Sequence, residues 1–154
     1  MRGRFEREIA LKTDPDHIWT RLTDLELLAS FVSVIGSIQE VAPFEMYTAV
    51  LKDKVGPFTL LAPIEVSVVD LVEYERVSIN GIGEDRQVNS RIEFDASLSL
   101  EPDEGGGGTV VKVRATYEVG GKVATFGEAS IRKKAEKVID EFEASLLREF
   151  SEDK

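Results

Sequence analysis

Apolar and polar residues alternate along most of this chain, and a period of two is typical of strands with one buried face. The alternation begins in the first dozen residues, where Phe5, Ile9 and Leu11 share one side of a predicted strand. Six further strands are predicted, over residues 34–41, 45–55, 58–68, 74–82, 88–100 and 111–119. Since the apolar residues of each strand lie on one side, we expect an antiparallel sheet with one dry and one wet face.

The pattern changes between the first two predicted strands, where two short helices are expected. Thr13 or Asp14 can cap the first of them, with Pro15 in its first turn. Thr23 or Asp24 can cap the second. We interpret the pair as a V-shaped lid or prop for the sheet.

A single amphipathic stretch, residues 123–150, follows the turn Gly120-Gly121-Lys122 and ends the strand pattern. Its apolar residues are spaced by three and four, as in a helix with one buried side. At 1.5 Å per residue this helix would be about 42 Å long, and it alone is long enough to cover the dry face. The predicted fold class is α+β, with a single domain over residues 1–154. In this domain a seven-stranded curved antiparallel sheet wraps around one long C-terminal helix.

Two details of the strands are predicted with alternatives. Pro63 lies inside a long strand and indicates an edge position or a bulge, because proline has no N–H for the ladder. The end of the fifth predicted strand has two candidates. One is the hairpin dipeptide Asn80-Gly81, and the other is the polar stretch 83–87. We favour the polar stretch, because it gives that strand a useful length.

Small and light residues fill the first half of the last helix, Val123 to Ser130, whereas its second half is bulky. Facing a curved sheet, they would leave a cavity for a flat, largely apolar ligand. The equally weighted alternative is close packing of the helix backbone on the sheet, and each aromatic residue taken singly fits an ordinary core. The residues expected to line the cavity are Phe31, Tyr47, Phe58, Leu60, Phe94, Tyr117, Ala124, Phe126, Gly127 and Ile131.

Composition narrows the classes of function. The chain has 154 residues, no cysteine and a formal net charge of −10. That charge argues against a nucleic-acid binder and against general attachment to anionic lipid, and the lack of cysteine agrees with a reducing compartment. Neither a signal peptide nor an apolar run of about 18 residues is evident, so we expect a cytoplasmic protein.

Few residues are candidates for chemistry. His17 is the only histidine and is expected on the surface of the first short helix. Asp53 shares a strand face with Tyr47, and it is expected to face the core or to lie at its rim. Asp53, Tyr47 and Tyr117 are the candidates for acid–base catalysis near the interior, and His17 is remote from them. We therefore predict no catalytic residue, no bound metal and no cofactor.

Several segments resemble one known family. They are Asp14-Pro15-Asp16-His17-Ile18-Trp19, Thr23-Asp24-Leu25-Glu26-Leu27-Leu28, Lys54-Val55-Gly56-Pro57, and Tyr117-Glu118-Val119-Gly120-Gly121-Lys122-Val123-Ala124 with Gly127 after it. Together with the order of the predicted elements, they resemble the CoxG family of carbon monoxide dehydrogenase subunits, within the START and Bet v 1-like superfamily. The fold of that superfamily is called helix-grip, and the resemblance covers nearly the whole chain.

The resemblance implies a non-catalytic accessory protein that binds a quinone-like or lipid-like molecule in a cavity between sheet and helix. It also implies a partnership with a molybdenum-containing dehydrogenase and its recruitment to the inner face of a membrane, where the protein would be peripheral. Two alternatives stay open: an enzyme similar to the polyketide cyclases and dehydratases of the superfamily, and a protein-interaction module with an incidental cavity.

Overall fold

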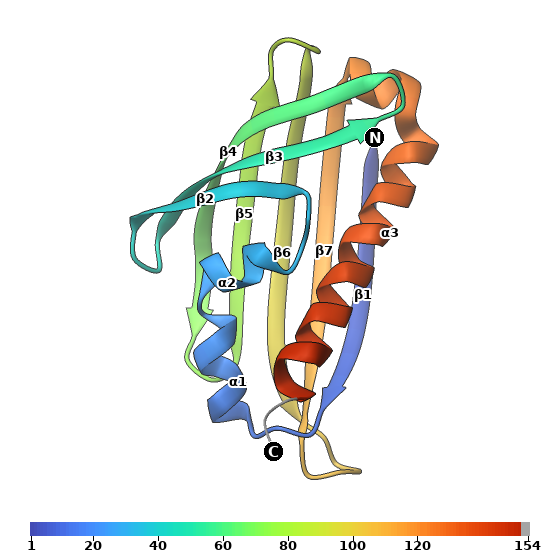
Figure 1. The fold of residues 1–154 in the computed structure, drawn as a ribbon. Coiled ribbons are helices and arrows are strands. Elements are labelled where there is room, and N and C mark those ends of the chain that lie inside the picture. The colour runs from blue at the N-terminus through green and yellow to red at the C-terminus, as the bar shows by residue number, and fades with distance from the viewer. Residues whose placement is uncertain (152–154) are drawn as a thin grey trace.

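The strands form one antiparallel sheet in the order β1-β7-β6-β5-β4-β3-β2, which confirms the predicted seven-stranded sheet (Figure 1). The computed structural model describes residues 1–151 of the chain. The strands are β1 (Arg2–Leu11), β2 (Ile35–Ala42), β3 (Met46–Val55), β4 (Phe58–Val72), β5 (Arg76–Asp85), β6 (Ser90–Pro102) and β7 (Thr109–Gly121). Because β1 pairs with β7, the first and last strands are neighbours.

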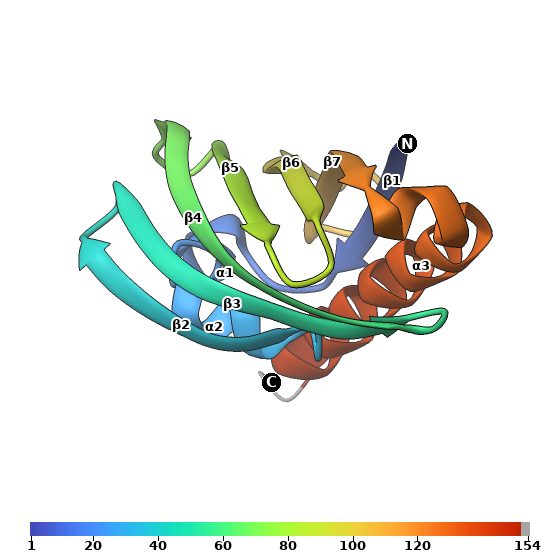
Figure 2. The same ribbon diagram turned by 90° about the horizontal axis from the view of Figure 1, so that it is seen from above.

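The sheet curls around one long helix, α3 (Lys122–Ser151), as Figure 2 shows from above. Strands β1 and β7 lie on one side of the helix, and the hairpin of β3 and β4 reaches it from the other. A 3.0 Å ion pair between Asp53 of β3 and Lys134 of α3 joins that hairpin to the helix. Asp53 is half-buried, so it lies at the rim of the core, which is one of its two predicted positions.

Both short helices begin at an aspartate, which was one of the two capping residues predicted for each. The Asp14 carboxylate accepts a hydrogen bond from a backbone N–H at 3.1 Å, at the start of α1 (Pro15–Leu22). The Asp24 carboxylate does the same, also at 3.1 Å, at the start of α2 (Leu25–Ser30). Such a cap stabilises a helix by about 1 kcal/mol. The two helices lie beside one end of the curled sheet, below β2 in Figure 1.

The long helix bends near its start. Gly127 has φ −128° and ψ 22°, which lie outside the helical region, and it separates a short first segment from a long second one. A Cβ atom at Gly127 would lie 2.9 Å from Cγ1 of Val55, so the glycine lets the helix approach β3 closely. Of the two interpretations of the small residues in this segment, close packing on the sheet is the one that holds at Gly127.

Buried apolar residues form two clusters in this fold. The lower cluster consists of Ile9, Leu11, Ile18, Trp19, Leu22, Phe31, Val77, Leu98, Val111, Val113, Ile139, Leu146 and Phe150. The upper cluster consists of Leu25, Tyr47, Ala49, Leu51, Val55, Leu60, Ala62, Ile64, Val66, Val119, Val123 and Ile131. Half-buried Leu28 and Val68 pack against both. A domain usually has one contiguous core, so the division of these buried residues into two clusters is a distinctive feature.

One strand detail differs from the predictions, and one resolves a predicted alternative. β5 continues to Asp85, because its last residues pair with the start of β6, and the loop therefore begins three residues later than predicted. β4 has no register shift at Pro63, so the predicted bulge is absent, but β4 is unpaired with β5 up to this residue, so Pro63 lies at an edge position, the other predicted alternative. The proline fits because the ladder between β4 and β5 ends at Ile64, so no ladder bond to β5 is required of Pro63.

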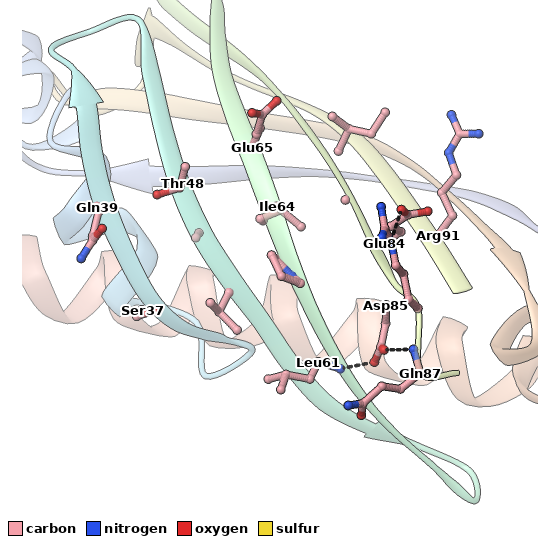
Figure 3. Close-up of a pocket in the computed structure, with 16 residues that line it drawn as sticks. Ser37, Gln39, Thr48, Leu61, Ile64, Glu65, Glu84, Asp85, Gln87 and Arg91 are labelled. Atoms are coloured by element: carbon pink, nitrogen blue, oxygen red, sulfur yellow. Dashed lines mark hydrogen bonds and ion pairs between the residues drawn. The ribbon is translucent and has the colours of Figure 1, made fainter. Parts of the chain in front are cut away.

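A buried carboxylate lies where β4 and β5 part. Asp85 is only 4% exposed. Its Oδ2 accepts a hydrogen bond from the Leu61 N–H at 2.7 Å, and its Oδ1 accepts one from the Gln87 N–H at 3.0 Å (Figure 3). The side chain thus provides the acceptor that β5 would otherwise supply to β4.

Replacing this carboxylate is expected to destabilise the fold. In an Asp85→Ala variant two backbone N–H groups lose their acceptor, and leaving such groups unsatisfied costs about 1–3 kcal/mol. Urea denaturation would measure the loss in the free energy of unfolding. The matched control is Glu84→Ala, because the ion pair of Glu84 with Arg86 is largely exposed and should contribute little. Equal unfolding free energies for the two variants would contradict this account of Asp85.

Candidate functional site

Alanines lie at the level between the two apolar clusters. Ala96 of β6 and Ala115 of β7 pair across the strands. On α3, Ala135 lies midway between Ile131 of the upper cluster and Ile139 of the lower one. None of the three alanines belongs to either cluster, and all three are half-buried. We call the region that they border the central gap.

Larger apolar side chains beside the central gap also remain partly accessible. Ile79 of β5, and Ile92 and Phe94 of β6, share the inner face of the sheet with the upper cluster, yet all three are only half-buried. A helix packed tightly against this face would bury them, because protein interiors are close-packed. Partial exposure of inward-facing residues is the pattern expected where a space separates sheet from helix.

Tyr117 places a polar group at the edge of the same region. Its ring is half-buried and lies 6.5 Å, centroid to centroid, from the ring of Phe5. Removal from water raises the pKa of the Tyr117 hydroxyl above its ordinary value of 10.0, while Arg132 of α3 opposes the rise and Glu136 adds to it. The hydroxyl is therefore neutral at physiological pH.

Most of the residues expected to line a cavity lie in or against one cluster. Seven of them belong to the upper cluster or pack against it: Tyr47, Leu60 and Ile131, which are buried, and Phe58, Phe94, Tyr117 and Ala124, which are half-buried. Gly127 contacts the same cluster through Val55. Phe31 instead belongs to the lower cluster, where its ring lies 5.9 Å from that of Phe142. The side chain of Phe126 is outside the described part of the structure.

Sequence reasoning did not single out Ala96 and Ala115 as site residues. Their signal was present, because each is a small residue at an inward position of a strand whose other inward residues are mostly bulky. Which strands would bring them together depends on the pairing of β6 with β7, and the alternation of a single strand does not reveal that register.

The candidates for acid–base chemistry do not form one group. Asp53 is paired with Lys134, and the Tyr47 hydroxyl accepts a hydrogen bond from the Phe44 N–H at 3.4 Å. These two residues are six positions apart on one strand, a separation of about 20 Å at the usual rise. His17 lies on α1, edge-on to the ring of Phe150 at 5.9 Å. Among the described residues no cluster of three or more metal-ligating side chains occurs.

A hollow of about 1020 Å³ occupies the outer face of the sheet where β4 and β5 part (Figure 3). Leu61 and Ile82 line it with exposed apolar side chains, and Glu84 and Arg91 add charge. The sequence analysis missed this hollow, although outward apolar residues such as Leu61 were its available signal. The hollow is open to solvent, whereas ligand sites usually bury most of their ligand.

Comparison with known proteins identifies the family. The model of the CoxG family, which describes a carbon monoxide dehydrogenase subunit, matches residues 8–151. No curated protein sequence matches the chain. Among the described residues, α3 and the shorter helices all lack the length or the apolarity required to cross a membrane.

Solved structures share the fold at low sequence identity. A conserved protein from Geobacillus kaustophilus is 18% identical with a TM-score of 0.76, over 98% of this chain and 95% of that one. A START superfamily protein from Mycobacterium smegmatis is 12% identical with a TM-score of 0.67, over 96% and 97%. The di-domain ARO/CYC StfQ from the steffimycin biosynthetic pathway is 12% identical with a TM-score of 0.62, over 99% of this chain and 52% of that one. The predicted START/Bet v 1-like helix-grip fold is thus confirmed.

The raised pKa of Tyr117 predicts how stability depends on pH. Because folding favours the neutral hydroxyl, this contribution is fully present below the ordinary pKa of 10.0 and is lost as the pH rises through the higher folded pKa. Wild-type protein should therefore lose unfolding free energy faster than Tyr117→Phe above that pH. Urea denaturation from neutral pH to about pH 11 would measure both curves. They should run parallel in the neutral range, and curves that stay parallel throughout would contradict the prediction.

Proposed function

The chain belongs to the CoxG family of carbon monoxide dehydrogenase subunits, and on that premise we propose that it binds an apolar small molecule between its sheet and α3. The proposed ligand is quinone-like or lipid-like. The proposed site is the central gap together with the adjoining residues of the upper cluster, which include Tyr47, Phe94, Tyr117 and Ala124.

One observation carries this proposal: the inner face of the sheet is partly accessible beside the central gap. Exposed apolar surface costs about 25 cal/mol for each Å² left in water, so half-buried Ile79, Ile92 and Phe94 leave free energy to be gained. An apolar ligand in the gap would cover these side chains and join the two clusters. The contact between the two clusters, which Leu28 and Val68 already bridge, would then be extended in the complex.

The arrangement of polar groups supports a binder over an enzyme. The START-like fold and the family are associated with ligand binding, and the fold also occurs in StfQ, which is named as an ARO/CYC protein. Acid–base catalysis needs groups within hydrogen-bond reach of one substrate. Here Asp53 is engaged by Lys134, and His17 packs on Phe150 at the end of α3, whereas Tyr117 lies on β7 shortly before α3 begins.

An accessory role is the finer part of the proposal. The family description names a carbon monoxide dehydrogenase subunit, which supports a partnership with an enzyme of that type. The further proposal is that the partner is the molybdenum-containing enzyme and that this protein is peripheral at the inner face of the membrane. If so, the protein should co-purify with such an enzyme from its own host. A second purification after washing the membranes with high salt would test the location. Recovery of the dehydrogenase entirely without this chain would contradict the partnership.

Filling the central gap should weaken ligand binding without unfolding the protein. In an Ala96→Phe variant the new ring would enter the gap and occupy the ligand's place. Titration with the fluorescent apolar probe N-phenyl-1-naphthylamine should show an affinity lower by about tenfold or more, equivalent to 1.4 kcal/mol. Thermal unfolding should show little loss of stability, because the gap has room for the ring. A ring added to an already filled core would instead cost about 1–3 kcal/mol.

The matched control is Ser97→Phe, which adds the same ring to the outer face of the same strand. Its affinity for the probe should equal that of the wild-type protein. Equal loss of binding in both variants would indicate a general effect of the added ring. Unchanged binding in Ala96→Phe would place the ligand elsewhere.

A further inference from the structure

Two glycines and two aromatic residues form one row across the inner face of the sheet, next to the central gap. Gly3 of β1 pairs with Tyr117 of β7, Tyr117 pairs with Phe94 of β6, and Phe94 pairs with Gly81 of β5. We call these four residues the aromatic rung. The neighbouring row on the same face contains the paired alanines of the gap, Ala96 and Ala115, so the rung and the gap are adjacent.

Each ring of the rung lies where the side chain of its glycine neighbour would be. A Cβ atom at Gly81 would lie 2.2 Å from Cζ of Phe94 and 2.4 Å from Cε1. A Cβ atom at Gly3 would lie 2.2 Å from both Cζ and the hydroxyl oxygen of Tyr117. Both rings therefore lean down onto the backbone of the next strand, as aromatic residues do when they cover a glycine in a sheet.

The two rings lean in opposite directions. Phe94 and Tyr117 are direct neighbours across β6 and β7, where paired side chains usually pack on each other. Here Phe94 turns toward β5 and Tyr117 turns toward β1, because each covers the glycine on its outer side. Neither ring tip therefore lies over the β6–β7 pair itself, and the next inward pair along these two strands is Ala96 with Ala115, whose side chains are single methyl groups.

We infer that the aromatic rung selects for a planar ring system in the proposed site. Gly3 and Gly81 have no side chain, so the rings of Tyr117 and Phe94 can lie down on the sheet. This inference rests on the proposed function. A broad, low surface of aromatic rings and methyl groups offers contact to the whole face of a planar ligand, through offset stacking and apolar contact. A flexible chain would cover less of that surface and would lose rotational freedom on binding.

Neither glycine of the rung has a positive φ, so both are required by the approach of the rings and not by the backbone. The atoms that a new Cβ would meet are the far ends of side chains, which can rotate away. Gly83 is different, because a Cβ there would lie 2.2 Å from the backbone oxygen of Pro63. Gly81→Ala is thus expected to fold, with the Phe94 ring raised from the sheet toward the gap.

The test compares two fluorescent probes in matched variants. N-phenyl-1-naphthylamine is a ring probe, and cis-parinaric acid is a chain probe. The measured quantity is the ratio of their affinities, so that the carboxylate of the chain probe affects all variants alike. Gly81→Ala should lower the preference for the ring probe by about tenfold, which corresponds to 1.4 kcal/mol. Gly36→Ala should leave it unchanged, since the nearest atom to a Cβ there is the Val50 oxygen at 3.7 Å.

A double variant keeps the test specific to the ring. In a Phe94→Leu background there is no ring to raise, so adding Gly81→Ala should change the ratio no further. The inference is overturned if Gly81→Ala keeps the wild-type ratio, if it weakens both probes equally, or if its effect persists without Phe94. Wild-type protein that binds neither probe would overturn the proposed function, and the ligand role of the rung with it.

Discussion

A single helix has to close the concave face of seven strands, and most of this structure follows from that constraint. Strands lie about 4.8 Å apart, so seven of them span roughly 29 Å, whereas a helix with its side chains is about 10–12 Å wide. The sheet must therefore curl until its two sides meet the helix. The ion pair of Asp53 with Lys134 and the approach of Gly127 to Val55 both lie where the β3–β4 hairpin completes this closure.

The same constraint explains why the core is divided. α3 contributes Ile131 to the upper cluster and Ile139 to the lower one. Between them the helix carries Ala135 and the sheet carries the pair Ala96 and Ala115, so small side chains face each other at this level. The two clusters provide most of the buried apolar contacts. The small side chains between them can therefore be substituted without removing a member of either cluster.

Much of this fold was predictable from the sequence because its signals are local. Alternation located the seven strands, and spacing by three and four located α3. For each short helix the sequence left two candidate N-cap residues. Only the observed hydrogen bonds identify Asp14 and Asp24 as the caps. The prediction failed at the end of β5, which continues to Asp85 because its end pairs with β6 and its carboxylate accepts a hydrogen bond from β4. At Pro63 the sequence left an edge position and a bulge open, and only the pairing shows the edge, because the ladder to β5 stops beside it.

The candidate site was predictable in its composition but not in its shape. Tyr47, Leu60 and Ile131 were expected near the interior and lie together in the upper cluster. The aromatic rung was not predictable, because Gly3 and Tyr117 meet only through the pairing of the first strand with the last. The polar residues near the site are engaged in holding the fold, as Asp53 and Asp85 show. The side chains at the gap are mainly apolar, so recognition of a ligand there would depend on shape and apolar contact.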